Sequence, residues 1–375
     1  MREGHDVRVV APLAPGAPPP GDPAHVVRVA VRARGRGLVA NLASQLRLMV
    51  ALRRASRRLV LSWEPDVVLV STPPPLAALA ALGLHARGRR RIAVVADVRD
   101  IWPDVLIEAG ALRRGSPATA VLSAASAILL RRASAVTTPT ELKRARLAAR
   151  TSAPVTVVVN GVDAVEAREE PAYRGGGAEG PFEALYAGNV GRAQDVGLLV
   201  RAVRAVRSMR ERSRHEGRAV VATIVGDGED ARAVAALAAD APVTIHSGET
   251  RAAVAERLAC CGCAFVSLRT ALMRDAVPSK MLEAMARGVP VVLAGAGEAA
   301  SILEAAGGGW VVPPGDVSAL ARALELVAAL SPEERRAIGA RGRAHVLAHF
   351  RRESAARELS RVLIACCRVR GSEPS

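Results

Sequence analysis

The stretch Asp275-Ala-Val-Pro-Ser-Lys-Met-Leu-Glu-Ala-Met-Ala-Arg-Gly-Val-Pro-Val-Val292 predicts a loop, a two-turn helix, a tight turn and a buried strand. Ser279, which follows Pro278, is a suitable residue to cap the start of this helix. Apolar residues at helical spacing then give the helix one buried face. Gly288 and Pro290 end it, because glycine favours the left-handed turn after a helix and proline does not continue one.

The start of this predicted helix has the chemistry of a phosphate-binding site. A helix N-terminus presents unpaired N–H groups and a partial positive charge. Lys280 lies in the first turn and adds a full charge, and Glu283 can accept two hydrogen bonds from a diol such as a ribose. An ordinary amphipathic helix with a solvated Lys280 and Glu283 would look the same, so the stretch alone leaves both interpretations open.

The stretch also resembles the donor-nucleotide motif of the family 4 retaining glycosyltransferases, which have the GT-B fold. In that family two acidic residues are spaced Glu-x7-Glu, and the second opens the pattern Glu-Ala-Met-Ala-x-Gly-x-Pro-Val-Val. Asp275 and Glu283 keep this spacing, with Asp in place of the first Glu. The Pro-Ser-Lys that ends at Lys280 is typical of the branch that builds bacterial surface polysaccharides.

Length and composition fit two α/β domains. The 375 residues suffice for two domains of ordinary size, and 50% of them are hydrophobic. Aromatic residues make up only 2%, which argues against recognition of nucleic acid by base stacking. No stretch of about 18 apolar residues lacks a charge, so no transmembrane helix is expected. The five cysteines suggest no disulfide framework, which indicates a reducing, cytoplasmic location.

Positive charge is concentrated in the first part of the chain. Residues 1–160 hold 24 of the 52 Lys and Arg residues but only 10 of the 36 Asp and Glu residues, a net charge of +14. The remaining residues hold 28 and 26, a net charge of +2. The segment from Leu38 to Leu61 alternates apolar and arginine positions at helical period. Such a face would attract anionic lipid, a pyrophosphate-linked acceptor or nucleic acid, and the helix could also simply pack on the sheet. We expect the first domain to bind an anionic membrane surface as a peripheral protein, and we expect no nucleic-acid partner.

A glycine-flanked loop follows the first strand of the second domain. That strand runs into Gly188 and Gly191, and glycines let a backbone approach a ligand closely. Arg192, directly after them, can reach a phosphate. By its position before the Lys280 motif, the loop is similar to the donor loop of the family. The resemblance adds Gly226 to the donor site and places His246–Thr250 near the nucleotide base.

Polar residues of the first domain gather directly after the predicted strand Ile92–Ala96. Ligands of open α/β sheets bind beyond the carboxyl ends of the strands. Four residues lie at such an end: Asp97, Arg99, Asp100 and Trp102. Their Asp-x-Arg-Asp-x-Trp-Pro pattern also resembles the matching segment of the polysaccharide branch. Acidic residues here would bind acceptor hydroxyls or orient the sugar, and capping of the following helix by Asp100 is the alternative.

The alternation of strands and helices predicts two Rossmann-like domains that face each other across a cleft, the GT-B arrangement. The expected parts are an acceptor-side domain at 1–163, a linker at 164–181, a nucleotide-sugar-binding domain at 182–350 and a helix at 351–375 that crosses back to the first domain. Gly4-His5-Asp6 resembles the point where the family's second strand begins. On that resemblance the first strand and its Gly-rich loop are missing, and the 375-residue chain alone is expected to be poorly soluble and nearly inactive.

The resemblance implies a retaining glycosyltransferase that moves a sugar from a nucleotide-sugar donor to a polyprenyl-pyrophosphate-linked glycan at the inner face of the cell membrane. It assigns catalytic roles to Arg192, Lys280, Asp275 and Asp100, donor binding to Gly188, Gly191, Ser279, Glu283 and Gly226, and the acceptor side to Asp97, Arg99 and Trp102. No metal and no cofactor beyond the co-substrate is expected. The alternatives are a GT-B sugar-nucleotide epimerase and a non-catalytic scaffold that binds nucleotide sugar.

Overall fold

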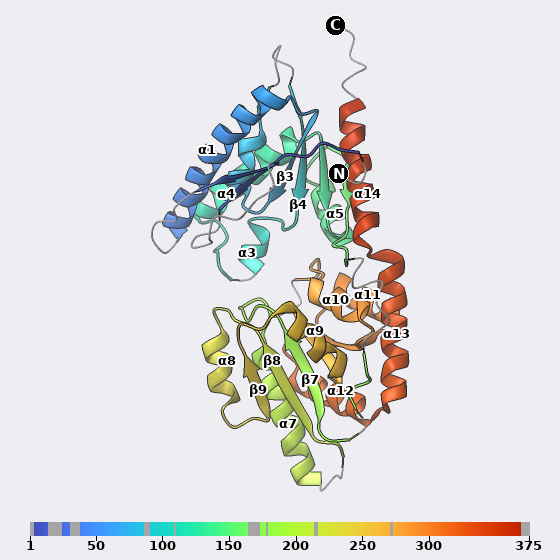
Figure 1. The fold of residues 1–375 in the computed structure, drawn as a ribbon. Coiled ribbons are helices and arrows are strands. Elements are labelled where there is room, and N and C mark those ends of the chain that lie inside the picture. The colour runs from blue at the N-terminus through green and yellow to red at the C-terminus, as the bar shows by residue number, and fades with distance from the viewer. Residues whose placement is uncertain are drawn as a thin grey trace. The chain divides into compact units, whose positions relative to one another are not determined.

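The computed structural model describes residues 4–13, 25–30, 38–85, 91–108, 110–163, 173–177, 179–213, 217–270 and 273–368. The chain forms two compact units, Met1–Val158 with Ala356–Ser375, and Val159–Ala355 (Figure 1). Both units are built on parallel sheets with helices between successive strands. Most of the expected linker 164–181 lies outside the described residues.

The first unit holds two parallel sheets. Its strands are β1 (Val9–Pro12), β2 (Val26–Val29), β3 (Val67–Thr72), β4 (Ala93–Val98), β5 (Ala135–Thr138) and β6 (Val155–Val157). A four-stranded sheet has the order β3-β4-β5-β6, and β1 pairs with β2 separately. Every residue of β4 and β5 is buried, as expected of central parallel strands covered on both faces.

Helices of the first unit connect and cover these strands. They are α1 (Leu38–Trp63), α2 (Pro75–Ala78), α3 (Asp104–Glu108), α4 (Pro117–Arg132) and α5 (Glu141–Ala148), with most of α14 (Arg352–Arg368). Thr140 caps α5, since its side chain accepts a hydrogen bond from the Lys143 backbone N–H. The cap fixes where α5 starts, directly beyond the carboxyl end of β5.

The second unit is a doubly wound, six-stranded parallel sheet with the order β12-β11-β10-β7-β8-β9. Its strands are β7 (Phe182–Ala187), β8 (Val220–Val225), β9 (Val243–His246), β10 (Cys263–Ser267), β11 (Val291–Ala294) and β12 (Gly309–Val312). From β7 the chain first builds outward through β8 and β9, then returns to add β10, β11 and β12 on the other side. The switch point, where a ligand site is expected in such sheets, therefore lies between β7 and β10.

Helices cover both faces of this sheet. They are α7 (Gly197–Ser213), α8 (Ala231–Ala238), α9 (Arg251–Cys260), α10 (Ser279–Ala286), α11 (Glu298–Ala306), α12 (Val317–Ala329) and α13 (Pro332–His349). Along β7, Phe182 and Tyr186 pack in one core with α7 and α12, whereas Leu185 packs in the other core with α10 and α11. This alternation is the two-residue period of a strand buried on both sides.

Helix α10 begins one residue earlier than a capping role for Ser279 requires. Pro278 occupies the capping position with no side-chain hydrogen bond, and Ser279 is the first residue of α10. The capping role given to Ser279 was therefore wrong. The end of α10 is as expected, because the helix stops at Ala286 and Gly288 adopts a left-handed φ of 74°.

Within the parts of the chain that the structure describes, no helix combines the length and the apolarity that a membrane span needs.

Candidate active site

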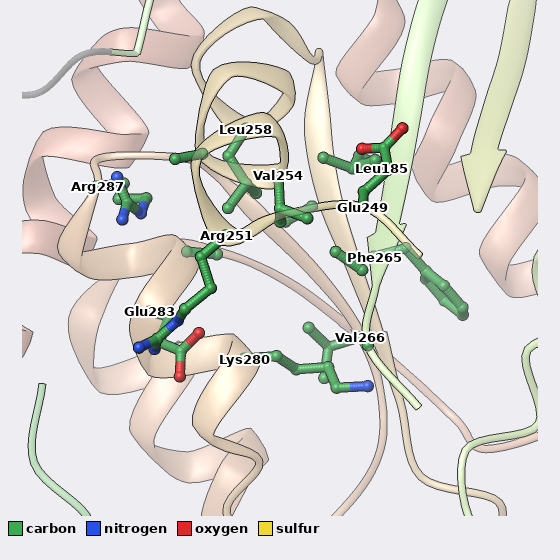
Figure 2. A pocket seen from close by; sticks show the side chains of 15 residues that line it. Leu185, Glu249, Arg251, Val254, Leu258, Phe265, Val266, Lys280, Glu283 and Arg287 are labelled. Atoms are coloured by element: carbon green, nitrogen blue, oxygen red, sulfur yellow. The ribbon is translucent and has the colours of Figure 1, made fainter. Parts of the chain in front are cut away.

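A cavity of about 220 Å³ lies at the switch point of the second unit (Figure 2). Strands β7 and β10 contribute Leu185 and Val266 to its lining. Helix α9 contributes Arg251 and Val254, and α10 contributes Lys280, Glu283 and Arg287. The cavity therefore joins an apolar floor to charged groups on the two helices, which is the usual composition of a small-molecule site.

Lys280 is held inside this site by a tyrosine. Its Nζ donates a hydrogen bond to Tyr186 Oη at 2.6 Å and lies 4.2 Å from the centroid of the Tyr186 ring. The hydroxyl in turn donates to the backbone oxygen of Asn189 at 2.6 Å. Burial lowers the pKa of Lys280 to about 8 and raises the pKa of Tyr186. Lys280 is thus a cation at neutral pH, and two of its three N–H donors remain for a ligand.

Glycines allow two backbone loops to meet beside Lys280. Gly188 has a φ of 141°, and a Cβ atom on it would lie 2.7 Å from Lys280 Nζ. A Cβ on Gly226, after β8, would lie 1.9 Å from the Gly188 carbonyl oxygen, and one on Gly228 would lie 2.3 Å from the Val190 oxygen. The loops are tied by the Gly188 N–H, which donates to Val225 O at 2.9 Å. Side chains at these glycines would force the backbones apart.

Acidic groups stand at two places in the cavity. Glu283 is half-buried on α10, one turn after the helix start. Glu249 lies in the loop before α9, and Arg257 donates to both of its carboxylate oxygens at 2.7 to 3.0 Å. These hydrogen bonds hold the pKa of Glu249 below its ordinary value. Of the segment His246–Thr250 that was expected near a nucleotide base, Glu249 lines the cavity.

The structure does not bring all the expected donor residues to the cavity. Asp275 is buried but is not among the lining residues. The Arg192 side chain is 69% exposed, and its Nε lies 3.3 Å from a Glu229 oxygen. Gly191 packs against the Asn189 amide instead of the cavity. The carboxylate of Asp275 and the guanidinium of Arg192 therefore lie outside the group formed by Lys280 and Glu283.

In the first unit Asp97 joins three adjacent strands. Its Oδ1 accepts a hydrogen bond from Thr137 Oγ1 at 3.0 Å. Its Oδ2 accepts one from Ser71 Oγ at 3.2 Å and one from Arg99 Nε at 2.8 Å. Asp97 is 7% exposed and has these partners on β3, β5 and the loop after β4. Its geometry is that of a strand-linking group.

Asp100 and Trp102 lie further along the same loop. The Asp100 side chain is 45% exposed, and one of its oxygens lies 3.7 Å from the buried Nζ of Lys143. The Trp102 ring is half-buried against the core of α2 and α4, and its carbonyl oxygen accepts from Ser126 Oγ at 2.8 Å. Both residues line a hollow of about 20 Å³, roughly the room of one water molecule.

Several residues of these sites carried no recognisable pattern in the sequence. Tyr186 lies 94 positions from its partner Lys280 in the sequence. Arg251 and Arg287 also line the cavity, but nothing in the sequence distinguishes them from the many other arginines of the chain. Lys143 opens an ordinary helical turn. Among the described residues, no group of three or more His, Cys, Asp or Glu side chains has the arrangement of a metal site.

Comparison with protein families matches a different family model to the first and to the second part of the chain. A model described as "Glycosyltransferase Family 4" matches residues 1–166, and one described as "Glycosyl transferases group 1" matches residues 181–329. Each of these two parts of the chain thus matches a glycosyltransferase family model. These families give no support to the epimerase alternative.

Individual relatives of these glycosyltransferase domains are distant. The "Probable glycosyltransferase WbjE" of Pseudomonas aeruginosa is 26% identical over 281 residues, which cover 71% of this chain and 66% of that protein. Sucrose-phosphate synthase from Thermosynechococcus elongatus has a TM-score of 0.73 at 16% identity, over 94% of this chain and 87% of that one. Anabaena HepE, solved with UDP and glucose, has a TM-score of 0.66 at 16% identity, over 96% and 99%. The expected GT-B fold is confirmed.

Proposed function

We propose that this chain is a retaining glycosyltransferase that uses a nucleotide-sugar donor. The acceptor is a polyprenyl-pyrophosphate-linked glycan, and the product belongs to cell-surface polysaccharide synthesis at the inner face of the cell membrane. Support comes from the two glycosyltransferase family matches and from the printed name of the Pseudomonas aeruginosa relative. The UDP and glucose bound to Anabaena HepE, which has the same fold, fit a nucleotide-sugar donor.

The observation that carries this proposal is the cavity at the switch point of the second unit. Lys280 offers an ammonium group at the start of α10, where the helix N-terminus also favours an anion. Glu283 offers a carboxylate one turn further into the same cavity. A nucleoside diphosphate calls for these two kinds of group, a cation for the diphosphate and an acceptor for the ribose hydroxyls.

The transfer breaks the bond between the anomeric carbon and the diphosphate oxygen, and it forms a bond from that carbon to an acceptor hydroxyl oxygen. The acceptor proton passes to the departing phosphate. Lys280 stabilises the negative charge that develops on this phosphate, which is the main electrostatic task of the site. Arg192 adds a second positive charge on binding the donor, when its guanidinium exchanges Glu229 for phosphate. Asp275 holds hydroxyls of the transferred sugar. Asp100, a residue of the first unit, binds acceptor hydroxyls or orients the sugar.

A membrane-linked acceptor fits the exposed surface of α1. Apolar and cationic side chains alternate along it, and the exposed ones include Leu46, Arg47, Val50, Arg54, Arg57, Arg58 and Leu61. Leucine and valine can enter the headgroup region while the arginines pair with anionic lipid. We propose that α1 docks the first unit on the membrane surface that carries the acceptor.

The test is an assay for nucleoside diphosphate release with UDP-, GDP- and ADP-sugars, with and without a polyprenyl-pyrophosphate-linked glycan. We expect one nucleotide class to be consumed, faster when the glycan is present, and the anomeric proton of the product to show retention by NMR. A chain that consumes none of these donors would contradict the proposal, and an inverted product would contradict its retaining part.

A further inference from the structure

The chain uses arginine for almost every positive charge. Its sequence holds 52 Lys and Arg residues, and Lys143 and Lys280 are the only lysines among them. Arginine thus fills nearly every position at which either cation is tolerated. A position that keeps lysine in such a chain is one where the small ammonium group fits and the planar guanidinium does not.

Both lysines lie in a candidate site, one in each unit. Lys280 lines the cavity of the second unit and donates to Tyr186. Lys143 is 5% exposed, on the first turn of α5. Among the described residues, Arg335 is the other cation that is buried to this degree. Its guanidinium donates to the carbonyl oxygens of Gly175 and Gly177, so a buried arginine here needs several carbonyl partners.

The ammonium group of Lys143 lies close to a carboxylate. Asp100 Oδ1 lies 3.7 Å from Lys143 Nζ, and the Lys143 side chain is 6% exposed against 45% for Asp100. Asp100 follows the carboxyl end of β4, and α5 starts beyond the carboxyl end of β5, which pairs with β4. The ammonium group therefore lies beneath a carboxylate whose outer part is open to solvent at the ligand-binding edge of the sheet.

We infer that Lys143 is a positioning residue for the transfer reaction, whose buried ammonium group fixes the Asp100 carboxylate in the orientation in which it meets a sugar hydroxyl. This inference rests on the proposed function. Lys143 itself is too deeply buried to touch a substrate, so it acts through Asp100. The attraction between the ammonium group and the carboxylate oxygen 3.7 Å away favours one orientation of the Asp100 side chain.

A double-mutant cycle tests the connection between the two residues. We expect K143M and D100N each to lower kcat by about tenfold or more, because each removes one member of a partly buried ion pair, while the KM for the donor changes little. The double variant should be no slower than D100N, because Lys143 has no effect once the carboxylate is gone. A double variant whose loss equals the product of the two single losses would overturn the inference, as would a K143M enzyme with wild-type kcat.

A neighbouring cation provides the matched control. Arg144 is the next residue of α5, it is 45% exposed, and it pairs with Glu141 on the surface. R144M should keep wild-type kcat, KM and thermal midpoint. K143R should remain slow although it keeps the charge, because the guanidinium is larger than the ammonium group it replaces. A wild-type rate in K143R would overturn the argument from lysine usage.

A spectroscopic measurement separates this inference from the proposed function. Protein labelled with ¹³C at the lysine ε-carbon gives two signals, one for each lysine. We expect D100N to move the Lys143 signal and leave the Lys280 signal in place, and UDP or GDP to move the Lys280 signal. An unmoved Lys143 signal in D100N would overturn the inference. A chain that turns over no nucleotide sugar would overturn the proposed function, while these signals still report on the ion pair.

Discussion

Lys280 Nζ lies 2.6 Å from Tyr186 Oη, and this contact ties helix α10 to the end of strand β7. The same hydroxyl donates to Asn189 O, so the glycine-flanked loop, the tyrosine and the lysine form one connected unit. Binding of a diphosphate then needs little rearrangement, because the cation is already held beside the loop. Such preorganisation makes an electrostatic group effective in catalysis.

The first prediction concerns pH. Burial lowers the pKa of Lys280 to about 8, so its ammonium form is lost as the pH rises through about 8. The reaction needs the charged form, so kcat/KM for the donor should fall above about pH 8. In Y186F the ammonium group loses an acceptor oxygen, its pKa drops further, and the alkaline fall should begin at lower pH. Identical alkaline limbs in wild type and Y186F would refute this role of the hydroxyl.

The second prediction concerns the two charged groups of the cavity. K280M and E283Q should each weaken nucleoside diphosphate binding by about 1.5–3 kcal/mol, the range for charge-assisted hydrogen bonds. Isothermal titration with UDP and GDP measures this loss. E256Q is the matched control, since Glu256 is 71% exposed on α9 and pairs with Arg174 at the surface. Full affinity in both cavity variants would place the diphosphate elsewhere.

The third prediction concerns stability of the second unit. Arg335 is fully buried, stacks over Phe182 and donates to the Gly175, Gly177, Val327 and Leu330 carbonyl oxygens. R335M leaves these oxygens without their donor in an apolar setting, at a cost of about 1–3 kcal/mol for each unsatisfied group. We expect a total loss of about 3 kcal/mol or more, against less than about 1 kcal/mol for R336M, whose side chain pairs with Glu333 on the surface.

Urea unfolding followed by tryptophan fluorescence measures this loss. Trp310 lies on β12 and packs against the core of the second unit, whereas Trp63 and Trp102 belong to the first. In a W63F/W102F background the signal therefore reports on the second unit alone, which avoids treating two units as one transition. Equal unfolding midpoints for R335M and R336M would mean that the buried guanidinium contributes no net stability.

The fourth prediction concerns the membrane. Sedimentation with anionic vesicles should show binding that weakens as salt rises, because salt screens charges at the lipid surface. R54E/R57E/R58E on α1 should abolish this binding. R201E/R207E/R212E, on the exposed side of α7 in the second unit, changes net charge equally and should leave it intact. Equal loss in both triple variants would show that overall charge, not α1, attracts the vesicles, and strong salt-dependent binding to RNA would favour a nucleic-acid partner.

Local patterns in the sequence predicted the parts of the fold that depend on neighbouring residues. The stop of α10 ahead of Gly288 and the basic helix from Leu38 follow from backbone preference and helical period, and both are present. The capping role of Ser279 was wrong because Pro278 already supplies the extended residue before the helix. A single backbone position decided the cap, and the spacing of apolar residues carries no information about it.

Contacts between distant segments were outside the reach of such patterns. The hydrogen bond between Lys280 and Tyr186, and the ion pair between Lys143 and Asp100, join residues on different strands and helices. The pairing of Arg192 with Glu229 likewise depends on how two loops meet after folding. Strand order brings these residues together, and strand order follows from packing of whole elements rather than from any short motif.

The close approach of the loops after β7 and β8 limits how the site can change. With the Gly226 position only 1.9 Å from a neighbouring carbonyl oxygen when a Cβ is added, no other residue type is accommodated there, whatever its polarity. Gly226 thereby holds the neighbouring Gly188 loop in place, and Gly188 itself contributes only backbone to the lining of the cavity. New donor preferences must therefore arise at lining residues that carry variable side chains, such as Glu249, Arg251 and Arg287. A library that varies those three positions and fixes the glycines would explore donor choice without loss of the fold.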